Sequence, residues 1–387
     1  MKGPILEDTT LRDGEQSPGV AFNEAIKLNI LDLLIKAGVS WIEIGIPVMG
    51  GRELKAIKAM LERKYNAALV GWNRGIKKDI KQSIDLGFKY IHIGLPASDI
   101  HLKDSVKKDR NWLLAQSADL IKYAKDRDVF VSVSAEDVGR TELNFLKQYA
   151  NHVRECGADR LRLSDTIGIL SPEKYSNIFS EIKKDCDIDL HSHAHNDFGF
   201  AVANTIAALK AGARYFHVTV NGIGERAGMA DIAQVAFALK HLYGADLGID
   251  GAALMELSQY VGSVTKPTPP WCPIVGENVF SHESGIHVNG MLRNKLAFEA
   301  ILPEELGRES KFILGKHSGR STIEFHLNQH EIIPSSQQLD MLLEWLRDES
   351  MNRLGSVSPA DLIDYYNSQF SNKATESQKE VENDSIS

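Results

Sequence analysis

Three histidines alternate along one short segment of the chain, HSHAHND at residues 191–197. Neighbouring side chains on a β-strand point to opposite faces, so His191, His193 and His195 share one face if this segment is extended. Two imidazoles at positions i and i+2 can chelate one metal ion. A polar strand end with solvated histidines is the alternative, but three histidines in alternation favour a metal site.

A carboxylate would complete such a site and lower its net charge. Asp13, in the segment DTTLRDGEQ, is the best candidate, and its competitor Asp8 lies earlier on the expected strand, which favours a structural role. A mixed nitrogen and oxygen ligand set with open positions suits catalytic Mg²⁺, Mn²⁺ or Zn²⁺. The neighbouring Arg12 could bind a 2-oxo acid that the same ion chelates. An ion pair of Arg12 with Asp8 or Glu15 is the alternative.

Three more polar residues follow expected strands: Arg74 in GWNRG, Glu136 in VSVSAED and Thr166 in LRLSDTIG. Each alone could be a loop residue or a helix cap. Together they are expected to surround the same end of the fold. The glycine-rich segment NGIGERAG, residues 221–228, could approach a phosphate or coenzyme A, although such a loop alone is a weak signal.

The elements that must position these residues are short β-rich runs that alternate with amphipathic helical segments. Four segments (IKAGVSWIEI, IDLGFKYIHI, RECGADRLRL and LKAGARYFHV) repeat one helix–glycine–strand pattern. This predicts a (β/α)8 TIM barrel with its active site at the C-terminal ends of the strands. An open doubly wound sheet is less consistent, because the first strand lacks a phosphate-binding glycine turn. The expected strands are Pro4–Glu7, Trp41–Ile46, Ala67–Trp72, Tyr90–Leu95, Phe130–Ser134, Arg160–Leu163, Ile188–His193 and Tyr215–Val220.

The barrel is expected to occupy residues 1–265. A proline-rich linker and a first C-terminal subdomain follow at residues 266–310, because four prolines between residues 267 and 273 exclude a helix there. A second, mostly helical subdomain is expected at residues 311–366. The polar tail, residues 367–387, is predicted to be disordered.

Composition excludes several classes of protein. The 387 residues are 43% hydrophobic and carry a net charge of −8 without a basic stripe, which argues against nucleic-acid or membrane-surface binding. The three cysteines form no Cys-x-x-Cys pair, which is typical of a reducing compartment. No apolar run has the length of a signal peptide or a membrane span. The sequence therefore predicts a cytoplasmic protein that acts on small molecules.

Four motifs, DTTLRDGEQSPG, HAHND at residues 193–197, NGIGERAG and SHESGIHVNG, occur in this order. Together they resemble the Claisen-condensing metalloenzymes of the isopropylmalate and homocitrate synthase family, from about residue 5 to residue 325. The resemblance implies a TIM barrel, a divalent metal ion and acetyl-CoA as the acyl donor. It also implies a homodimer in which the C-terminal region of one chain reaches the active site of its partner.

The resemblance assigns roles by position. It implies that Arg12 holds and polarises the acceptor carbonyl. It implies that Glu136 and His287 perform acid–base chemistry on the acetyl methyl group, His287 coming from the partner chain. The implied metal ligands are Asp13, His193 and His195, and the implied substrate-binding residues are Arg12, Gln16, Arg74, Ser134 and Thr166.

Within the family, GWNRG, VSVSAED and GKHSGR are most similar to the homocitrate synthases associated with nitrogen fixation, which implies 2-oxoglutarate as the acceptor. The chain departs from lysine-pathway homocitrate synthases, which usually have His where it has Trp72 and Arg where it has Ser132. Both residues help those enzymes to bind the distal carboxylate, and Arg74 could replace them. Met229 stands where isopropylmalate synthases have an asparagine ligand, and water or substrate is expected to fill that position.

Other products of the same chemistry stay open: 2-isopropylmalate, citramalate, citrate or a phosphono analogue. An aldol lyase of the 3-hydroxy-3-methylglutaryl-CoA type shares the metal barrel, but the segment SHESGIHVNG favours the synthases. A metal-binding barrel without catalysis is disfavoured by Arg12, Glu136 and His287. The chain also ends before the leucine-sensing domain typical of isopropylmalate synthases, which predicts no feedback by leucine.

Overall fold

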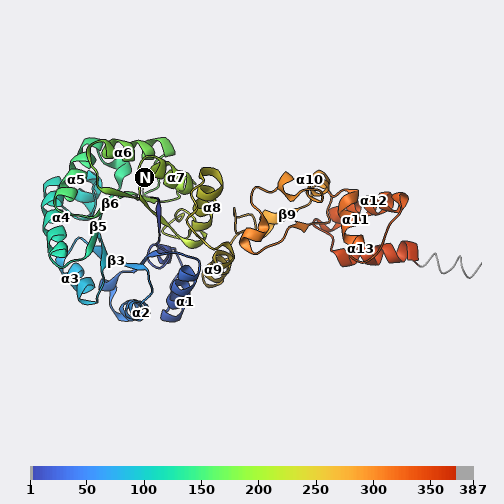
Figure 1. Ribbon diagram of the computed structural model, residues 1–387, viewed down its shortest axis with the longest axis horizontal. Helices are drawn as coiled ribbons and strands as arrows, with labels where there is room; N and C mark the ends of the chain where they lie inside the picture. Colours follow the sequence, from blue (N-terminus) through green and yellow to red (C-terminus); the bar gives the residue numbers. More distant parts are fainter. Residues whose placement is uncertain (1–2, 372–387) are drawn as a thin grey trace, which may run out of the picture. The chain divides into compact units, whose positions relative to one another are not determined.

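The computed structural model describes residues 3–371, and the N-terminal part of the chain is a closed barrel of parallel strands (Figure 1). The strands follow one another around the barrel in chain order, and β8 pairs with β1 to close it. The predicted (β/α)8 fold is confirmed. The strands are β1 Ile5–Asp8, β2 Trp41–Gly45, β3 Ala68–Arg74, β4 Tyr90–Gly94, β5 Phe130–Glu136, β6 Arg160–Asp165, β7 Asp189–Ala194 and β8 Tyr215–Val218.

Helices surround the barrel and connect its strands (Figure 1). Several begin at a side chain that accepts a hydrogen bond from a backbone N–H of the first turn, as Asn23, Ser171 and Asp231 do. Such caps satisfy donors that the helix itself cannot pair. The helices of this unit are α1 Glu24–Lys36, α2 Gly51–Glu62, α3 Lys77–Asp85, α4 Arg110–Lys125, α5 Leu143–Glu155, α6 Pro172–Asp185, α7 Ala201–Lys210, α8 Ile232–Tyr243 and α9 Gly251–Val264.

Strand β5 illustrates how the barrel separates its core from its site. Val131 and Val133 are completely buried, and they alternate with serines whose hydroxyls bond to neighbouring strands. Ser132 contacts Arg160 of β6, and Ser134 accepts a hydrogen bond from the Leu95 backbone N–H. Because successive side chains point to opposite faces, the valines pack beneath the helices while the serines and Glu136 face the interior.

Aromatic rings close the lower, N-terminal end of the barrel. The ring of Trp41 lies 5.0 Å from that of Tyr90, 5.3 Å from that of Phe130 and 5.2 Å from that of Tyr215, all edge to face. The guanidinium of Arg160 lies above this group, 4.7 Å from the centre of the Tyr215 ring. These contacts combine apolar burial with cation–π attraction. The opposite end of the barrel is left for the polar site.

Each predicted strand overlaps an observed one, but three strands end two residues later than predicted. Strands β3, β5 and β6 end at Arg74, Glu136 and Asp165, and these terminal residues still pair with the adjacent strand or have a partner in register. The last residue of each of these strands is charged, so the apolar pattern ends before the backbone pairing does. Arg74 and Glu136, which were expected just after strands, therefore lie on them, whereas Thr166 follows β6 as expected.

The chain divides into two compact units: residues up to Pro269 with Pro273–Val275, and Pro270–Cys272 with the residues from Gly276 onward. No helix occurs between residues 265 and 276, in line with the prolines there. The second unit has a hydrophobic core between its helices that includes Leu314, Ile323 and Leu346. Its elements are β9 Ser281–His282, α10 Gly285–Met291, β10 Lys311–Phe312, α11 Arg320–Asn328, α12 Ser336–Arg353 and α13 Pro359–Tyr366.

The expected disordered tail begins at residue 367, whereas Asn367–Ser371 form a short helical turn. The remainder of that tail, residues 372–387, lies outside the described residues. Among residues 3–371, no helix is both long and apolar enough to cross a membrane.

Candidate active site

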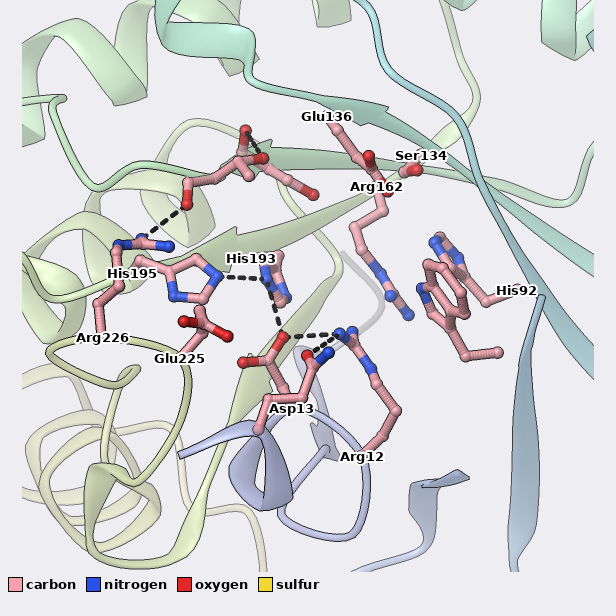
Figure 2. Close-up of a pocket in the computed structure, with 14 residues that line it drawn as sticks. Arg12, Asp13, His92, Ser134, Glu136, Arg162, His193, His195, Glu225 and Arg226 are labelled. Atoms are coloured by element: carbon pink, nitrogen blue, oxygen red, sulfur yellow. Dashed lines mark hydrogen bonds and ion pairs between the residues drawn. The ribbon is translucent and has the colours of Figure 1, made fainter. Parts of the chain in front are cut away.

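A polar pocket of about 210 Å³ opens at the C-terminal ends of the barrel strands (Figure 2). The structure brings together eight of the residues that the sequence singled out: Arg12, Asp13, Gln16, Ser134, Glu136, Thr166, His193 and His195. Six further residues complete the lining: Trp72, His92, Arg162, Ser164, Glu225 and Arg226.

Asp13, His193 and His195 form a compact group in this pocket, each with an acceptor atom within 4.8 Å of the others. Their Nε2 atoms place the two imidazoles 3.2 Å apart, and His193 Nε2 lies 3.7 Å from Asp13 Oδ2. An ion held about 2.1 Å from each nitrogen would separate them by roughly 3.0–3.4 Å. The buried Oδ1 of Asp13 has no hydrogen-bond partner. Donor type, spacing and this orphaned oxygen fit a divalent metal ion.

The orientation of His193 is fixed from below by two buried side chains. Glu7, ion-paired with Arg160 at 2.6 Å, lies 3.0 Å from His217 Nε2. A carboxylate accepts, so His217 carries its proton on Nε2 and its Nδ1 accepts from His193 Nδ1, 2.7 Å away. The Nε2 lone pair of His193 is then directed toward Asp13 and His195. This carboxylate–histidine–histidine chain selects the tautomer that a metal ligand needs.

His191 shares the interior face with the other two histidines, as the alternation predicts, but it lies deeper. Its Nδ1 accepts a hydrogen bond from Arg162 Nε at 3.4 Å. With Glu7 and His217 it forms a second group whose geometry could hold a metal ion. Arg160 and Arg162 both contact Glu7 there, so guanidinium groups already supply the positive charge.

Arg12 is held between two acids at the edge of the pocket. Its Nη1 donates to Asp13 Oδ2 at 2.6 Å, and its Nε donates to Glu43. The two acids that were the alternative partners of Arg12 are engaged elsewhere. Asp8 accepts a hydrogen bond from the Thr10 backbone N–H at 2.8 Å, and Glu15 pairs with Lys27 at 2.6 Å. Burial would lower the pKa of Arg12, but Glu43 and Asp13 raise it above its ordinary value. Arg12 therefore remains a fixed positive charge.

Glu136 is an acid of the pocket whose pKa is shifted. Burial raises its pKa above the ordinary value, with Arg12 and Arg162 opposing this shift. Thr166 is held nearby, since its hydroxyl accepts a hydrogen bond from the backbone N–H of Asp137 at 2.8 Å. The site thus combines a carboxyl of raised pKa with fixed hydroxyl groups.

Two residues of the expected site are not in this pocket. The side chain of Arg74 is 54% exposed and its Nε pairs with Asp79 at 2.7 Å. It is not among the residues that line the pocket, so it does not replace a distal-carboxylate ligand there. His287 lies in the second unit on α10, exposed, with its ring stacked on Phe298 at a centroid distance of 4.1 Å.

Comparison with known protein families connects this site to an activity. Residues 4–261 match the family model described as HMGL-like, and residues 274–353 match the model described as homocitrate synthase post-HMGL domain-like. The first match covers well over half of the chain. The chain belongs to the HMGL-like family.

Similar proteins of known name indicate which enzymes of this family the chain is related to, and they are synthases. The chain is 56% identical to a protein of Streptomyces rubellomurinus named 2-phosphonomethylmalate synthase, over 94% of this chain and 98% of the relative. It is 40% identical to a Nostoc protein named homocitrate synthase 1, over 94% and 97%. The chain is therefore an acyltransferase of this metal-dependent family, which uses acetyl-CoA as co-substrate.

A solved structure supports the fold of this synthase. A hydroxymethylglutaryl-CoA lyase from Pseudomonas aeruginosa matches with a TM-score of 0.61 and 21% identity, over 68% of this chain and 93% of the other. At this identity the likeness concerns the barrel fold and no more.

The sequence reasoning missed Arg162 and His92 as lining residues of the synthase, and it treated Trp72 only as a departure from relatives. All three lie on strands, facing the interior. The alternation R-L-R-L in β6 could have revealed Arg162, because its leucines are completely buried and the residues between them must face inward. Burial lowers the pKa of His92 well below its ordinary value, with Arg162 acting in the same direction, so this imidazole stays neutral.

Proposed function

We propose that this synthase condenses acetyl-CoA with a 2-oxo acid whose distal group is negatively charged, and that 3-phosphonopyruvate is the preferred acceptor. The main support for this acceptor is the 56% identity to the Streptomyces 2-phosphonomethylmalate synthase, which extends along nearly the whole of both chains. Removing the two-carbon acetyl unit from 2-phosphonomethylmalate leaves 3-phosphonopyruvate. The acceptor class is therefore a short 2-oxo acid with two anionic groups.

The charge of the pocket supports an anionic acceptor. Trp72 is the one large apolar side chain among its lining residues, and Arg12, Arg162 and Arg226 contribute guanidinium groups. An aliphatic distal group, as in the acceptor for 2-isopropylmalate, would displace water from these groups without pairing them, which is unfavourable. An acidic distal group would pair with them.

The positions of the lining residues support the following binding roles. Asp13, His193 and His195 would hold a divalent metal ion, Mg²⁺, Mn²⁺ or Zn²⁺. When bound, this ion would polarise the ketone of the acceptor and neutralise charge that develops on its oxygen. Arg12 would donate to the same acceptor group, and the acceptor carboxylate would bind at Thr166, with Ser134 and Gln16 beside it.

Glu136 would act as the base that removes a proton from the acetyl methyl group of acetyl-CoA. The resulting carbanion forms a bond to the ketone carbon of the acceptor, whose oxygen takes up a proton. Water then cleaves the thioester, which releases coenzyme A and a carboxylate. The methyl proton is weakly acidic, so a carboxylate in a desolvated site with nearby positive charge is required. The raised pKa of Glu136 makes it a stronger base than an exposed glutamate.

Homocitrate formation from 2-oxoglutarate is the second candidate, favoured by the 40% identity to the Nostoc homocitrate synthase 1. The pocket offers less to its distal carboxylate. Ser132 is buried, and its hydroxyl is engaged with His92 Nδ1 and Arg160 Nε, each at 2.9 Å. Arg74 pairs with Asp79 outside the lining. A role in nitrogen fixation would apply only if homocitrate is the product.

The decisive experiment is a thiol-release assay with acetyl-CoA and a panel of acceptors: 3-phosphonopyruvate, 2-oxoglutarate, 2-oxoisovalerate and pyruvate. We expect the highest kcat/KM with 3-phosphonopyruvate, loss of activity with EDTA, and recovery when Mg²⁺, Mn²⁺ or Zn²⁺ is added back. A highest kcat/KM with 2-oxoglutarate would establish the second candidate, and one with 2-oxoisovalerate would refute both.

His287 is proposed to complete the site from the partner subunit of a homodimer. Mixing inactive Glu136→Gln chains with inactive His287→Ala chains tests this. A heterodimer would contain one site with both residues intact, so random exchange of chains would restore about a quarter of the wild-type activity. Mass spectrometry would verify that heterodimers form. A mixture of the two variants that contains heterodimers and stays inactive would contradict this arrangement.

A further inference from the structure

Arg162 has a donor group that no other part of the described protein uses. Its side chain is only about 1% exposed, and it lines the pocket from strand β6. Its Nη2 donates to Glu43 at 2.8 Å and to Glu7 at 3.3 Å. Its Nη1 is buried without a hydrogen-bond partner. Buried donors are nearly always paired in folded proteins, so an unpaired guanidinium N–H in a pocket points to a ligand.

The two glutamates fix where this guanidinium lies. Glu7 on β1 and Glu43 on β2 hold Nη2, and Nε is directed at His191. Figure 2 shows the Arg162 side chain extending into the pocket toward Arg12 and His92. In the β5–β6 register Arg162 lies opposite Ser134. The guanidinium is therefore held in place at the wall of the pocket, on a strand and not on a loop.

The buried charges around the proposed metal site favour an anionic ligand. Arg12, Arg160 and Arg162 pair with three carboxylates, Glu7, Glu43 and Asp13. A divalent metal ion bound at Asp13 would add two positive charges, of which a charged Glu136 would offset one. An excess of buried positive charge is costly unless an anion compensates it. The network is built to receive negative charge from the substrate.

We propose that Arg162 binds the distal anionic group of the acceptor and thereby determines which 2-oxo acid is used. This inference rests on the proposed condensation and adds to it the residue that selects the acceptor. A phosphonate has three oxygens and up to two negative charges, so it can accept from Nη1 while Nη2 remains bound to the glutamates. A charge-assisted hydrogen bond in a desolvated site gives both affinity and discrimination.

The test compares two acceptors that differ only in the distal group: 3-phosphonopyruvate, and pyruvate, which has a hydrogen in place of the phosphonate. For Arg162→Gln we expect the ratio of kcat/KM values, phosphonopyruvate over pyruvate, to fall by about 10- to 100-fold, mainly through KM for phosphonopyruvate. Arg162→Lys keeps a charge that can pair with both glutamates but lacks the second donor arm, so it should fold and still lose about tenfold in this ratio.

Arg160→Gln is the matched control. Arg160 is two residues earlier on β6, is equally buried and also pairs with Glu7, but it does not line the pocket. Its replacement should disturb the same network and leave the ratio within about twofold of wild type. An unchanged ratio in both Arg162 variants, or an equal fall in Arg160→Gln, would refute the assignment. Absence of thiol release by the wild-type enzyme with every acceptor would instead refute the proposed function.

Discussion

Two groups of histidine and acid side chains lie at different depths in the same barrel. The lower group is Glu7, His191 and His217, and the upper group is Asp13, His193 and His195; both bring their acceptor atoms within 4.8 Å of one another. In the lower group, guanidinium groups and a second histidine already engage the carboxylate. In the upper group, the buried Oδ1 of Asp13 has neither a hydrogen-bond nor an ion-pair partner, whereas Glu7 Oε2, which also accepts no hydrogen bond, is ion-paired with Arg160 at 2.6 Å. Closeness of ligands is therefore not sufficient for a metal site; available lone pairs decide.

The largest expected effect separates the two groups directly. Asp13→Asn removes the negative charge of the upper group, so tight metal binding should be lost and kcat/KM should fall by at least about a thousandfold. Metal content after gel filtration and thiol release measure the two effects. Asp13→Asn protein that retains stoichiometric metal and wild-type turnover would place the metal elsewhere.

Glu136 belongs to the upper, reactive part of the barrel, and its replacement by Gln should lower kcat by about 10²- to 10⁴-fold without lowering metal content. The base must be ionised, so activity should fall as pH decreases through the pKa of Glu136. Burial raises this pKa, which places the acidic limb above the pH expected for an exposed glutamate. A kcat/KM profile in which this limb is missing from the wild type, or unchanged in the variant, would contradict the assignment.

His217 links the two groups, and its replacement should have an intermediate effect. His217→Leu removes the acceptor for His193 Nδ1–H and should weaken metal binding by about 10- to 100-fold. His217→Asn can present an amide oxygen near the position of Nδ1 and should recover part of this loss. Metal affinity is measured by competition with a chelator, independently of turnover. Equal affinities in both variants would show that His217 does not select the tautomer.

The smallest effect on the metal is expected in the lower group. His191→Gln should leave metal affinity within about threefold of wild type, because Arg162 and not a metal ion engages its Nδ1. The free energy of unfolding should fall by about 1–3 kcal/mol, since a buried partner of Arg162 is altered. Chelator competition and denaturant unfolding check both numbers. Loss of metal binding in this variant would erase the distinction between the groups.

The barrel and the upper group could be predicted from sequence because both depend on short-range patterns. The repeated helix–glycine–strand segments define the order of the strands. The spacing of His193 and His195 places both imidazoles on one face when the segment is extended. Asp13 follows the first strand, and a closed parallel barrel brings the ends of the first and seventh strands to the same opening.

The ion pairs around the lower group could not be predicted from the sequence, because the paired residues are distant in sequence. Arg162 meets Glu43 and Glu7 across separations of 119 and 155 residues, and no local pattern records such pairings. Arg74 was expected at the pocket but lies outside it, for a different reason. It is the last residue of β3, and its side chain pairs with Asp79 of α3 instead of facing the pocket. The side chain of the last residue in a strand turns toward the nearest group that can pair with it, and this group is not apparent from the strand's own sequence.

The aromatic group around Trp41 has a consequence for the order of events. It fills the lower end of the barrel, so a ligand of the pocket would enter from the C-terminal ends of the strands. An acceptor bound beside Arg162, as proposed above, would have to enter before the bulkier thioester covers it. Release would then run in the reverse direction, with free coenzyme A leaving first and the newly formed acid last.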